Sequence, residues 1–266
     1  MARSSSGESV LTRVVRILDA FGPESQVLTV SQISHRAALP LATTARLIKE
    51  MSRHGLLARD ERRHVRIGTR MWELAERASP VLGLRETAQP YLRDLQAVVG
   101  HSTQLGLMDG DEVLFVERLT KPDSVVNVTR IAGRLPLHAS SAGLILLAHA
   151  PAEVQERVVR GPLPAPTRHT IGDERVLRAA LAEVRRRGFA FCPGHIHPDA
   201  TGIAVPVRQD GRVVAALGLV VPNDDAAWPL HRPLQLTGLA LSRALSTTAE
   251  VPPFNGKAAG RLPSPG

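Results

Sequence analysis

Three basic side chains, Arg46, Lys49 and Arg53, are spaced so that they share one face of a helix. A guanidinium group can donate two hydrogen bonds to a guanine edge, and any of these cations can bind a phosphate. We therefore expect Arg46 to contact a base, and Lys49 and Arg53 to contact the backbone of a nucleic acid. Thr43 and Thr44 fall in the first turn of the same helix, where base edges are usually reached.

A second basic segment follows closely and contains Arg62, Arg63 and Arg66. Residues 56–59 and 64–67 are short strand-like runs, and the charged residues between them are typical of a hairpin turn. A basic hairpin beside a basic helix can reach a groove of duplex DNA next to the one that the helix enters. This segment therefore predicts the wing of a winged helix-turn-helix.

The elements that must position these cations are also visible in the sequence. The apolar period predicts a helix over residues 9–21, and residues 29–32 (TVSQ) form a capping-box pattern that begins a short helix over 30–38. Leu39 and Pro40 interrupt the helical pattern before the basic helix, which ends near residue 54. Two short helices with a tight break, followed by a hairpin, are typical of a winged helix-turn-helix.

Charge is distributed unevenly along the chain. Residues 1–80 contain 13 Lys or Arg and 8 Asp or Glu, a net charge of +5, whereas residues 81–266 carry +3. An excess of positive charge in under a third of the chain favours a polyanionic partner for that third.

The overall composition excludes several classes of protein. Hydrophobic residues make up 43% of the chain and charged residues 22%, which is typical of a globular protein. No apolar run is long enough to cross a bilayer, and residues 1–8 lack the apolar core of a signal peptide. Cys192 is the single cysteine, so no internal disulfide can form. We expect a cytoplasmic protein with no membrane partner.

Two further groups of residues could do chemistry, but the pattern argues against both. The loop 192–198 (CPGHIHP) holds one cysteine and two histidines, yet the spacing is short, two prolines interrupt it and no fourth metal ligand is apparent. His138 precedes Ser140 and Ser141, yet no acid or oxyanion donor can be assigned to complete a catalytic nucleophile. We expect no metal, no cofactor and no enzymatic activity.

The rest of the chain alternates helical and strand patterns. Asp109-Gly110 and Asp210-Gly211 are hairpin turn signals. Helices are expected at 85–99, 139–150, 173–187 and 233–246, and strands at 103–108, 112–119, 125–129, 202–208 and 213–221. Such a sheet with helices commonly leaves a concavity for a small molecule. We expect this sheet to be mixed.

A helix capped by Thr69 connects the two parts. Its apolar stripe is longer than a small winged domain can cover, so we expect it to support dimerisation. The stripe comprises Met71, Trp72, Leu74 and Ala75.

An ordered series of motifs resembles the IclR-type regulators. Residues 39–48 (LPLATTARLI) resemble the recognition-helix motif of the family, and residues 134–143 (RLPLHASSAG) resemble its central segment. Residues 170–173 (TIGD), 187–190 (RGFA) and 204–207 (AVPV) resemble its later signatures. A single motif of this kind would be weak evidence for a resemblance, but the occurrence of all of them in the same order over nearly the whole chain is specific to the family.

The resemblance implies an α+β protein with an N-terminal winged helix-turn-helix, a linker helix used in dimerisation and a C-terminal GAF-like mixed α/β effector domain. It also implies dimers or tetramers on near-palindromic operators in double-stranded DNA. The implied effector-binding residues are Ser140, Ser141, Ala142, Gly143, Cys192, His195, Gly202, Ile203, Gly218 and Val220.

This sequence departs from the family at the effector site. Gly202 stands where members often have cysteine, and Gly218 and Val220 stand where they often have serines. Leu144 replaces a common lysine, and the loop from Cys192 lacks the common acidic residues. Because polar groups are lost and the glycines should create room, we expect an aromatic or extended organic acid that is bulkier than a short keto acid.

These observations predict five segments. They are a disordered tail (1–8), a DNA-binding domain (9–68), a linker helix (69–83), an effector domain (84–250) and a second disordered tail (251–266). The favoured function is an effector-responsive regulator of a metabolic or catabolic operon. Two alternatives stay open: a DNA-binding protein whose C-terminal half only oligomerises, and a metabolic enzyme with a fused helical domain.

Overall fold

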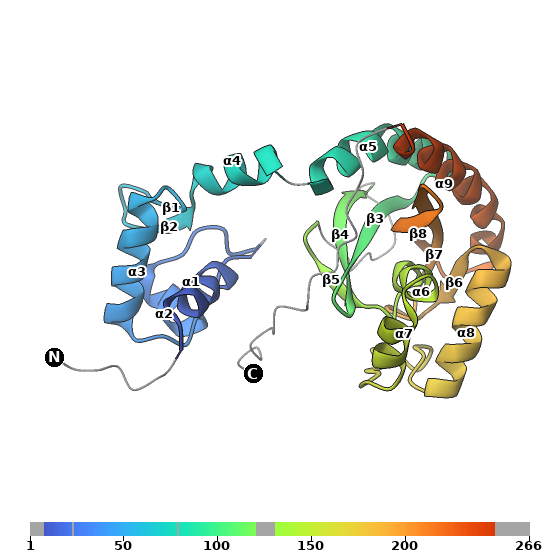
Figure 1. Ribbon diagram of the computed structural model, residues 1–266, viewed down its shortest axis with the longest axis horizontal. Helices are drawn as coiled ribbons and strands as arrows, with labels where there is room; N and C mark the ends of the chain where they lie inside the picture. The colour runs from blue at the N-terminus through green and yellow to red at the C-terminus, as the bar shows by residue number, and fades with distance from the viewer. Residues whose placement is uncertain (1–7, 23, 79, 121–130, 248–266) are drawn as a thin grey trace. The chain divides into compact units, whose positions relative to one another are not determined.

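The computed structural model describes residues 8–22, 24–78, 80–120 and 131–247. The predicted tails, apart from Glu8, and the predicted strand 125–129 lie outside these ranges. The chain divides between Ser79 and Pro80 into two compact units (Figure 1).

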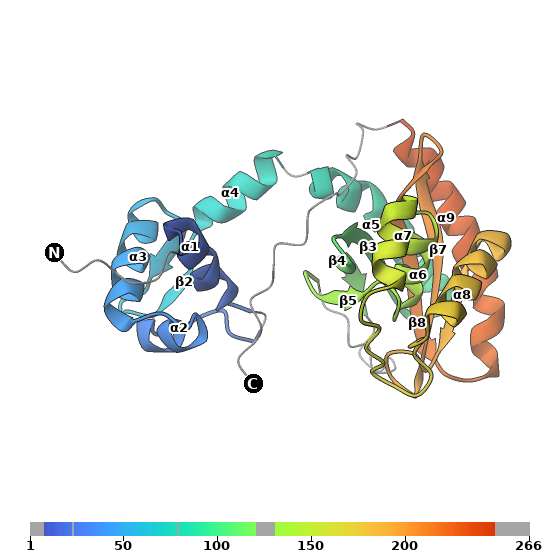
Figure 2. The same ribbon diagram turned by 60° about the horizontal axis from the view of Figure 1, so that its bottom comes forward.

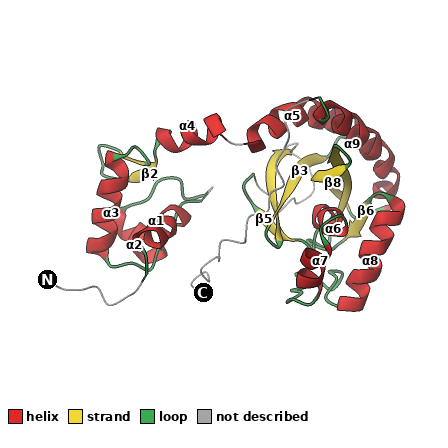
Figure 3. Ribbon diagram, in the orientation of Figure 1, coloured by secondary structure: helices red, strands yellow, loops and turns green. Residues whose placement is uncertain are grey.

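The N-terminal unit is built from short helices and one small hairpin (Figure 3). Its elements are α1 (Val10–Asp19), α2 (Val30–Arg36), α3 (Leu41–Arg53), β1 (Leu57–Arg59), β2 (Val65–Ile67) and α4 (Thr69–Ala78). The predicted helix-turn-helix and hairpin are confirmed in this order. Apolar residues of α1, α2 and α3 meet in one core, which includes Ile17, Ile33, Leu47 and Ile48.

Local signals explain where the helices of this unit begin and end. The capping box at α2 is complete, because the Thr29 hydroxyl accepts from the Gln32 amide and the Gln32 side chain accepts from the Thr29 amide. Ala38 has a positive φ of 49° and turns the chain before Pro40, after which α3 begins. At the other end of α3, Gly55 takes φ +73°, a conformation that glycine adopts without strain.

The β1–β2 hairpin is antiparallel, with Leu57 opposite Ile67 and Arg59 opposite Val65. In its turn, the Asp60 carboxylate accepts a 2.7 Å hydrogen bond from the His64 amide. Leu28 also bridges to Val65, so the hairpin is fixed to the segment that precedes α2.

The described residues of the C-terminal unit form a six-stranded sheet in the order β5-β4-β3-β8-β7-β6, packed with helices. Its strands are β3 (Ser102–Asp109), β4 (Glu112–Leu119), β5 (Arg134–Pro136), β6 (Ala190–Pro193), β7 (Ala200–Gln209) and β8 (Arg212–Pro222). Among the described strands, every pair of neighbours is antiparallel, so the expectation of a mixed sheet is wrong for this part of the chain. The predicted turn at Asp210 and Gly211 is confirmed, and both residues have a positive φ, as a tight hairpin requires.

Helices cover both faces of this sheet (Figures 1 and 2). They are α5 (Pro80–Val99), α6 (Ser141–Ala148), α7 (Ala152–Val159), α8 (Glu174–Arg187), the short 3-10 helix η1 (Asp225–Leu230) and α9 (His231–Leu245). Helices α5 and α9 pack on one face, and α6, α7 and α8 pack on the other. Helix α5 begins at Pro80 rather than near Arg85, because proline is compatible with the first turn of a helix.

Candidate nucleic-acid interface and effector site

Helix α3 presents a basic face to solvent. Arg46, Lys49 and Arg53 are exposed, and the opposite face of the helix is buried in the core of the N-terminal unit. Among the described residues, no carboxylate pairs with Arg46 or Lys49. Arg53 differs, since it pairs with Glu50 at 3.1 Å, so its charge is partly neutralised.

The two threonines of α3 do not lie as expected. Thr44 is fully buried, and its hydroxyl donates to the Pro40 carbonyl at 3.1 Å. Its side chain therefore belongs to the core, because residue 44 falls on the same helical face as Leu47 and Met51. Thr43 is half-buried at the edge of the exposed face.

The hairpin turn adds further cations on the same unit. Arg62, Arg63 and Arg66 are all exposed, and no described carboxylate pairs with them. Arg63 has φ +65°, so it sits in the left-handed position of the turn.

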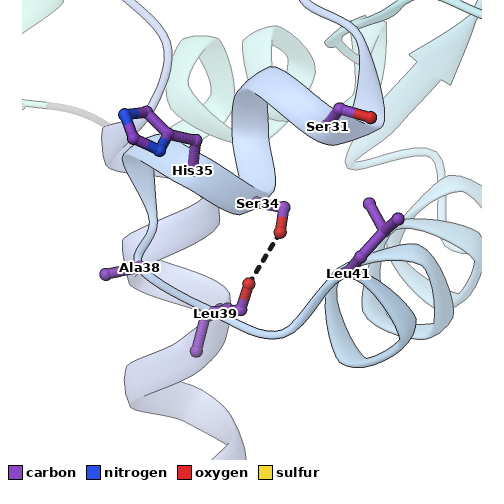
Figure 4. Close-up of a pocket in the computed structure, with 6 residues that line it drawn as sticks. All are labelled: Ser31, Ser34, His35, Ala38, Leu39 and Leu41. Carbon is purple, nitrogen blue, oxygen red and sulfur yellow. Dashed lines mark hydrogen bonds between the residues drawn. The ribbon is translucent and has the colours of Figure 1, made fainter.

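A depression of about 560 Å³ lies between α2 and the start of α3 (Figure 4). Its polar side comes from α2, and Leu41 of α3 stands across from Ser31 and Ser34. The Ser34 hydroxyl donates to the Leu39 carbonyl at 2.7 Å, which fixes the turn between the helices. The lining residues are Ser31, Ser34, His35, Ala38, Leu39 and Leu41.

In the C-terminal unit, the predicted effector residues gather around the start of α6. Ser140 is the N-cap, and its hydroxyl accepts from the Gly143 amide at 3.1 Å. Gly143 is needed for packing, since a Cβ there would lie 2.2 Å from the Leu137 carbonyl oxygen. Ser141 and Ala142 are buried against the sheet.

One row of sheet residues faces this helix start. In the strand register, Cys192 pairs with Gly202, Gly202 with Val220, and Val220 with Ser102. Ser141 reaches this row, because its Oγ would be 2.8 Å from a Cβ on Gly202. The structure thus brings Ser141, Cys192, Gly202 and Val220 together.

The next row contains Ala204, Gly218 and Gln104. A Cβ on Gly218 would lie 3.4 Å from Cγ of Gln104, and Gln104 is itself buried. Ser141 therefore occupies the space above Gly202, so the expectation that this glycine leaves room is wrong, whereas Gln104 borders Gly218 at an ordinary contact distance.

Ser102 and Gln104 were not predicted as site residues. Both are polar and buried at the start of β3, where Thr103 between them is also polar and buried, and buried polar side chains are uncommon. The signal that could have found them is the run of three polar residues, 102–104, that begins a strand otherwise rich in apolar residues.

Ile203 is not part of this arrangement. Its side chain belongs to the core on the opposite face of the sheet, with α5 and α9. Successive side chains of a strand point to opposite faces, so Gly202 and Ile203 cannot both face α6.

His195 interacts with the backbone of Ala139, just before the start of α6, and its Nδ1 is buried without a hydrogen-bond partner among the described residues. Burial lowers the pKa of His195, the neighbouring His169 lowers it further, and the backbone of Ala139 offsets part of this effect. The ring is therefore neutral near pH 7, with one nitrogen able to donate and the other able to accept.

The remaining reactive groups have other roles. Burial raises the pKa of the Cys192 thiol to about 12. His138 is buried, and its Nε2 lies 2.9 Å from the Pro164 carbonyl oxygen. Within the described ranges, no three His, Cys, Asp or Glu side chains gather in a metal-binding arrangement.

Helix α4 exposes large apolar side chains. Trp72 is 63% exposed and Leu74 is 47% exposed, with Ala75 also exposed and Met71 half-buried. Exposed tryptophan and leucine on one short helix are typical of an interface.

None of the helices within the described residues is both long and apolar enough to span a membrane. A helix-turn-helix with a basic solvent face, joined to an α/β unit with a buried polar site, defines a DNA-binding regulator with a sensor domain. Two family models match the chain: "IclR helix-turn-helix domain" over residues 10–61 and "Bacterial transcriptional regulator IclR C-terminal" over residues 77–226. The chain belongs to the IclR family of transcriptional regulators.

Individual relatives agree with this assignment. The regulator XynR of Escherichia coli is 31% identical over 89% of this chain and 97% of its own length. The Pca regulon regulatory protein of Pseudomonas putida is 28% identical over 79% of this chain and 72% of its own. An IclR homolog from Microbacterium hydrocarbonoxydans, solved in complex with 4-hydroxybenzoate, is 44% identical with a TM-score of 0.87, and the match covers 90% of this chain and all of that one.

Proposed function

We propose that this regulator binds a near-palindromic operator in double-stranded DNA, with α3 in the major groove and the β1–β2 hairpin beside it. The exposed basic face of α3 is the observation that carries this proposal. Arg46 contacts a base edge, and Lys49 binds the phosphate backbone, because neither is neutralised by a described carboxylate.

The hairpin cations Arg62, Arg63 and Arg66 add contacts that do not depend on sequence. Arg53 contributes less than Lys49, since Glu50 already pairs with it. Thr43 lies at the edge of the contact surface, and Thr44 supports the helix from within the core.

Two copies of the chain are needed to read two half-sites. We place the contact between copies on the expected linker segment 69–83, where α4 exposes Trp72, Leu74 and Ala75. Burying these side chains in a homodimer removes apolar surface from water and sets the spacing of the two recognition helices.

The effector site is the group of buried polar side chains at the start of α6. The amides of Ser141 and Ala142 lie in the first turn, where a helix has no carbonyl to accept from them, so they can bind a carboxylate. The buried Nδ1 of His195 offers a further hydrogen bond. Ser140 and Gly143 shape this turn, and Gly202 lets it approach the sheet.

We propose an aromatic acid as the effector. The bound 4-hydroxybenzoate of the 44% identical Microbacterium homolog supports this class. In the present chain, a ring with one carboxylate suits a site that has amide donors at one end and the apolar Val220 and Cys192 on the sheet. The regulator acts in the cytoplasm on a metabolic or catabolic operon, and carries out no reaction on its effector.

The experiment has two arms on the full-length protein. Selection from a random DNA library should enrich a near-palindromic site, and calorimetry with aromatic acids, including 4-hydroxybenzoate, should show binding. Binding to DNA without binding of any acid would favour a C-terminal half that only oligomerises. Failure to enrich any sequence would overturn the proposed DNA-binding function.

A further inference from the structure

Two exposed apolar side chains occupy the end of α3 that reads bases in a helix-turn-helix. Leu41 is the first residue of the helix and is 53% exposed, and Ala42 beside it is also exposed. The N-terminal residues of a recognition helix are those that meet base edges. Of the two threonines in the same turn, Thr44 is buried and cannot contact a base, and Thr43 is half-buried at the edge of the exposed face.

Leu41 contributes no buried side chain to the fold of this unit. The core of the N-terminal unit is formed by residues such as Ile33, Leu47 and Ile48, and Leu41 is outside it. Instead, Leu41 forms one side of the depression between α2 and α3, across from Ser31 and Ser34 (Figure 4). Its apolar surface is therefore available to a partner.

The positive charge on the same helix indicates which kind of partner meets this apolar surface. Arg46 and Lys49 are exposed on α3 without carboxylate partners among the described residues, which complements a polyanion. In the major groove of DNA, the apolar group that a base pair offers is the C5 methyl of thymine. Ala and other apolar side chains are known to contact this methyl group.

We propose that Leu41, with Ala42 beside it, contacts the C5 methyl group of a thymine in each operator half-site. This inference rests on the proposed DNA-binding function and adds a base preference to it. Ala42 and Arg46 are one turn apart, about 6 Å along the helix axis. Base pairs are stacked about 3.4 Å apart, so the thymine lies within about two base pairs of the base that Arg46 contacts.

The test removes only the methyl group. The full-length protein first selects its sites from a random duplex library, and each half-site thymine in a selected duplex is then replaced by deoxyuridine, one position at a time. At one position, loss of the methyl should weaken binding by about fourfold in one half-site and about fifteenfold in both. The measurement is the Kd of a labelled duplex by fluorescence anisotropy.

Two variants assign that effect to Leu41. Leu41→Ala should lose most of the discrimination between the thymine and deoxyuridine duplexes, with Ala42 supplying the remainder, and it should fold normally because Leu41 is largely exposed. Ser31→Ala, from the polar side of the same depression, is the matched control and should keep the wild-type discrimination.

The possible results distinguish failure of the thymine contact from failure of the proposed DNA-binding function. If no sequence is enriched, the proposed DNA-binding function fails and the inference fails with it. If an operator is selected but the wild type binds thymine and deoxyuridine duplexes equally, only the inference is overturned. The same holds if Leu41→Ala discriminates as well as the wild type does.

Discussion

Ser141 at the start of α6 occupies the space above Gly202 on β7: a Cβ on Gly202 would lie 2.8 Å from Ser141 Oγ and 3.4 Å from Ser141 Cβ. The first of these distances is shorter than packed atoms allow, and the second is tight but tolerable. A side chain at residue 202 would therefore force Ser141 Oγ to move from its present position.

A pair of substitutions tests this packing. Gly202→Ala alone should lower the free energy of unfolding by about 1–3 kcal/mol, since the added methyl overpacks the site. Adding Ser141→Ala removes the clashing oxygen and should restore most of the loss. Urea unfolding of the two single variants and the double variant gives the coupling energy, and strictly additive effects would contradict this packing.

On DNA, Arg46 and Lys49 should behave differently. Arg46→Ala should cost about 1–3 kcal/mol on the selected operator and relax the base preference. Lys49→Ala should weaken binding to all DNA sequences to a similar extent. It should also reduce the magnitude of the slope of log K (the observed binding constant) against log salt concentration by about 1. Arg53→Ala is the control. It should weaken DNA binding less than Lys49→Ala does, because Glu50 already pairs with Arg53. Equal effects of Arg53 and Arg46 on base preference would show that the contact surface is misassigned.

The exposed residues of α4 should control assembly. A Trp72→Glu, Leu74→Glu double change places two charges on the apolar face and should lower the sedimenting mass. Operator binding should weaken sharply, because one half-site provides too few contacts. Analytical ultracentrifugation with an exposed-residue control, Glu76→Lys, distinguishes interface loss from general charge effects. A double variant that stays dimeric would place the interface elsewhere.

The buried ring of His195 should make stability depend on pH. Burial lowers its pKa in the folded chain, so the unfolded chain binds a proton first as the pH falls below about 6.5. The stability that neutral His195 supports is therefore present above that pH and is lost on acidification. Between pH 7.5 and 5.5, the urea midpoint of unfolding should fall less for His195→Gln than for the wild type. An equal fall in the two proteins would mean that protonation of His195 does not reduce the stability of the folded chain.

Much of the N-terminal unit was predictable, because its signals are local. The capping box at Thr29, the break at Pro40 and the apolar period of α3 each depend on residues within a few positions. For the same reason, the hairpins at residues 110 and 210 could be placed. The short elements β5, β6 and α7 were not predicted. Elements of this length carry little periodicity, and these three lack a local turn signal such as the charged turn that marks the β1–β2 hairpin.

The site was harder to predict, because it depends on which face a side chain takes. Thr44 lies in the first turn of α3, but its angle around the helix turns it into the core. Ile203 adjoins Gly202 in sequence and points to the opposite face of the sheet. Gln104 lies beside Gly218 although it comes from a strand more than 100 residues earlier, because the order of strands in the sheet, and not either local sequence, makes the two residues neighbours.

In an effector-responsive regulator, binding at the effector site is coupled to binding at the operator site, and the thermodynamic linkage between the two ligands measures this coupling directly. Calorimetry gives the affinity for 4-hydroxybenzoate and related aromatic acids with and without a saturating selected operator, and anisotropy gives the operator affinity with and without the acid. An effector that binds the two states differently must change both affinities by the same factor. We expect at least one of the acids to be an effector. For that acid, the operator should change the acid affinity, and the acid should change the operator affinity, by the same factor of about fivefold or more. The contrary result is that no acid binds, or that the best ligand binds free and operator-bound protein equally.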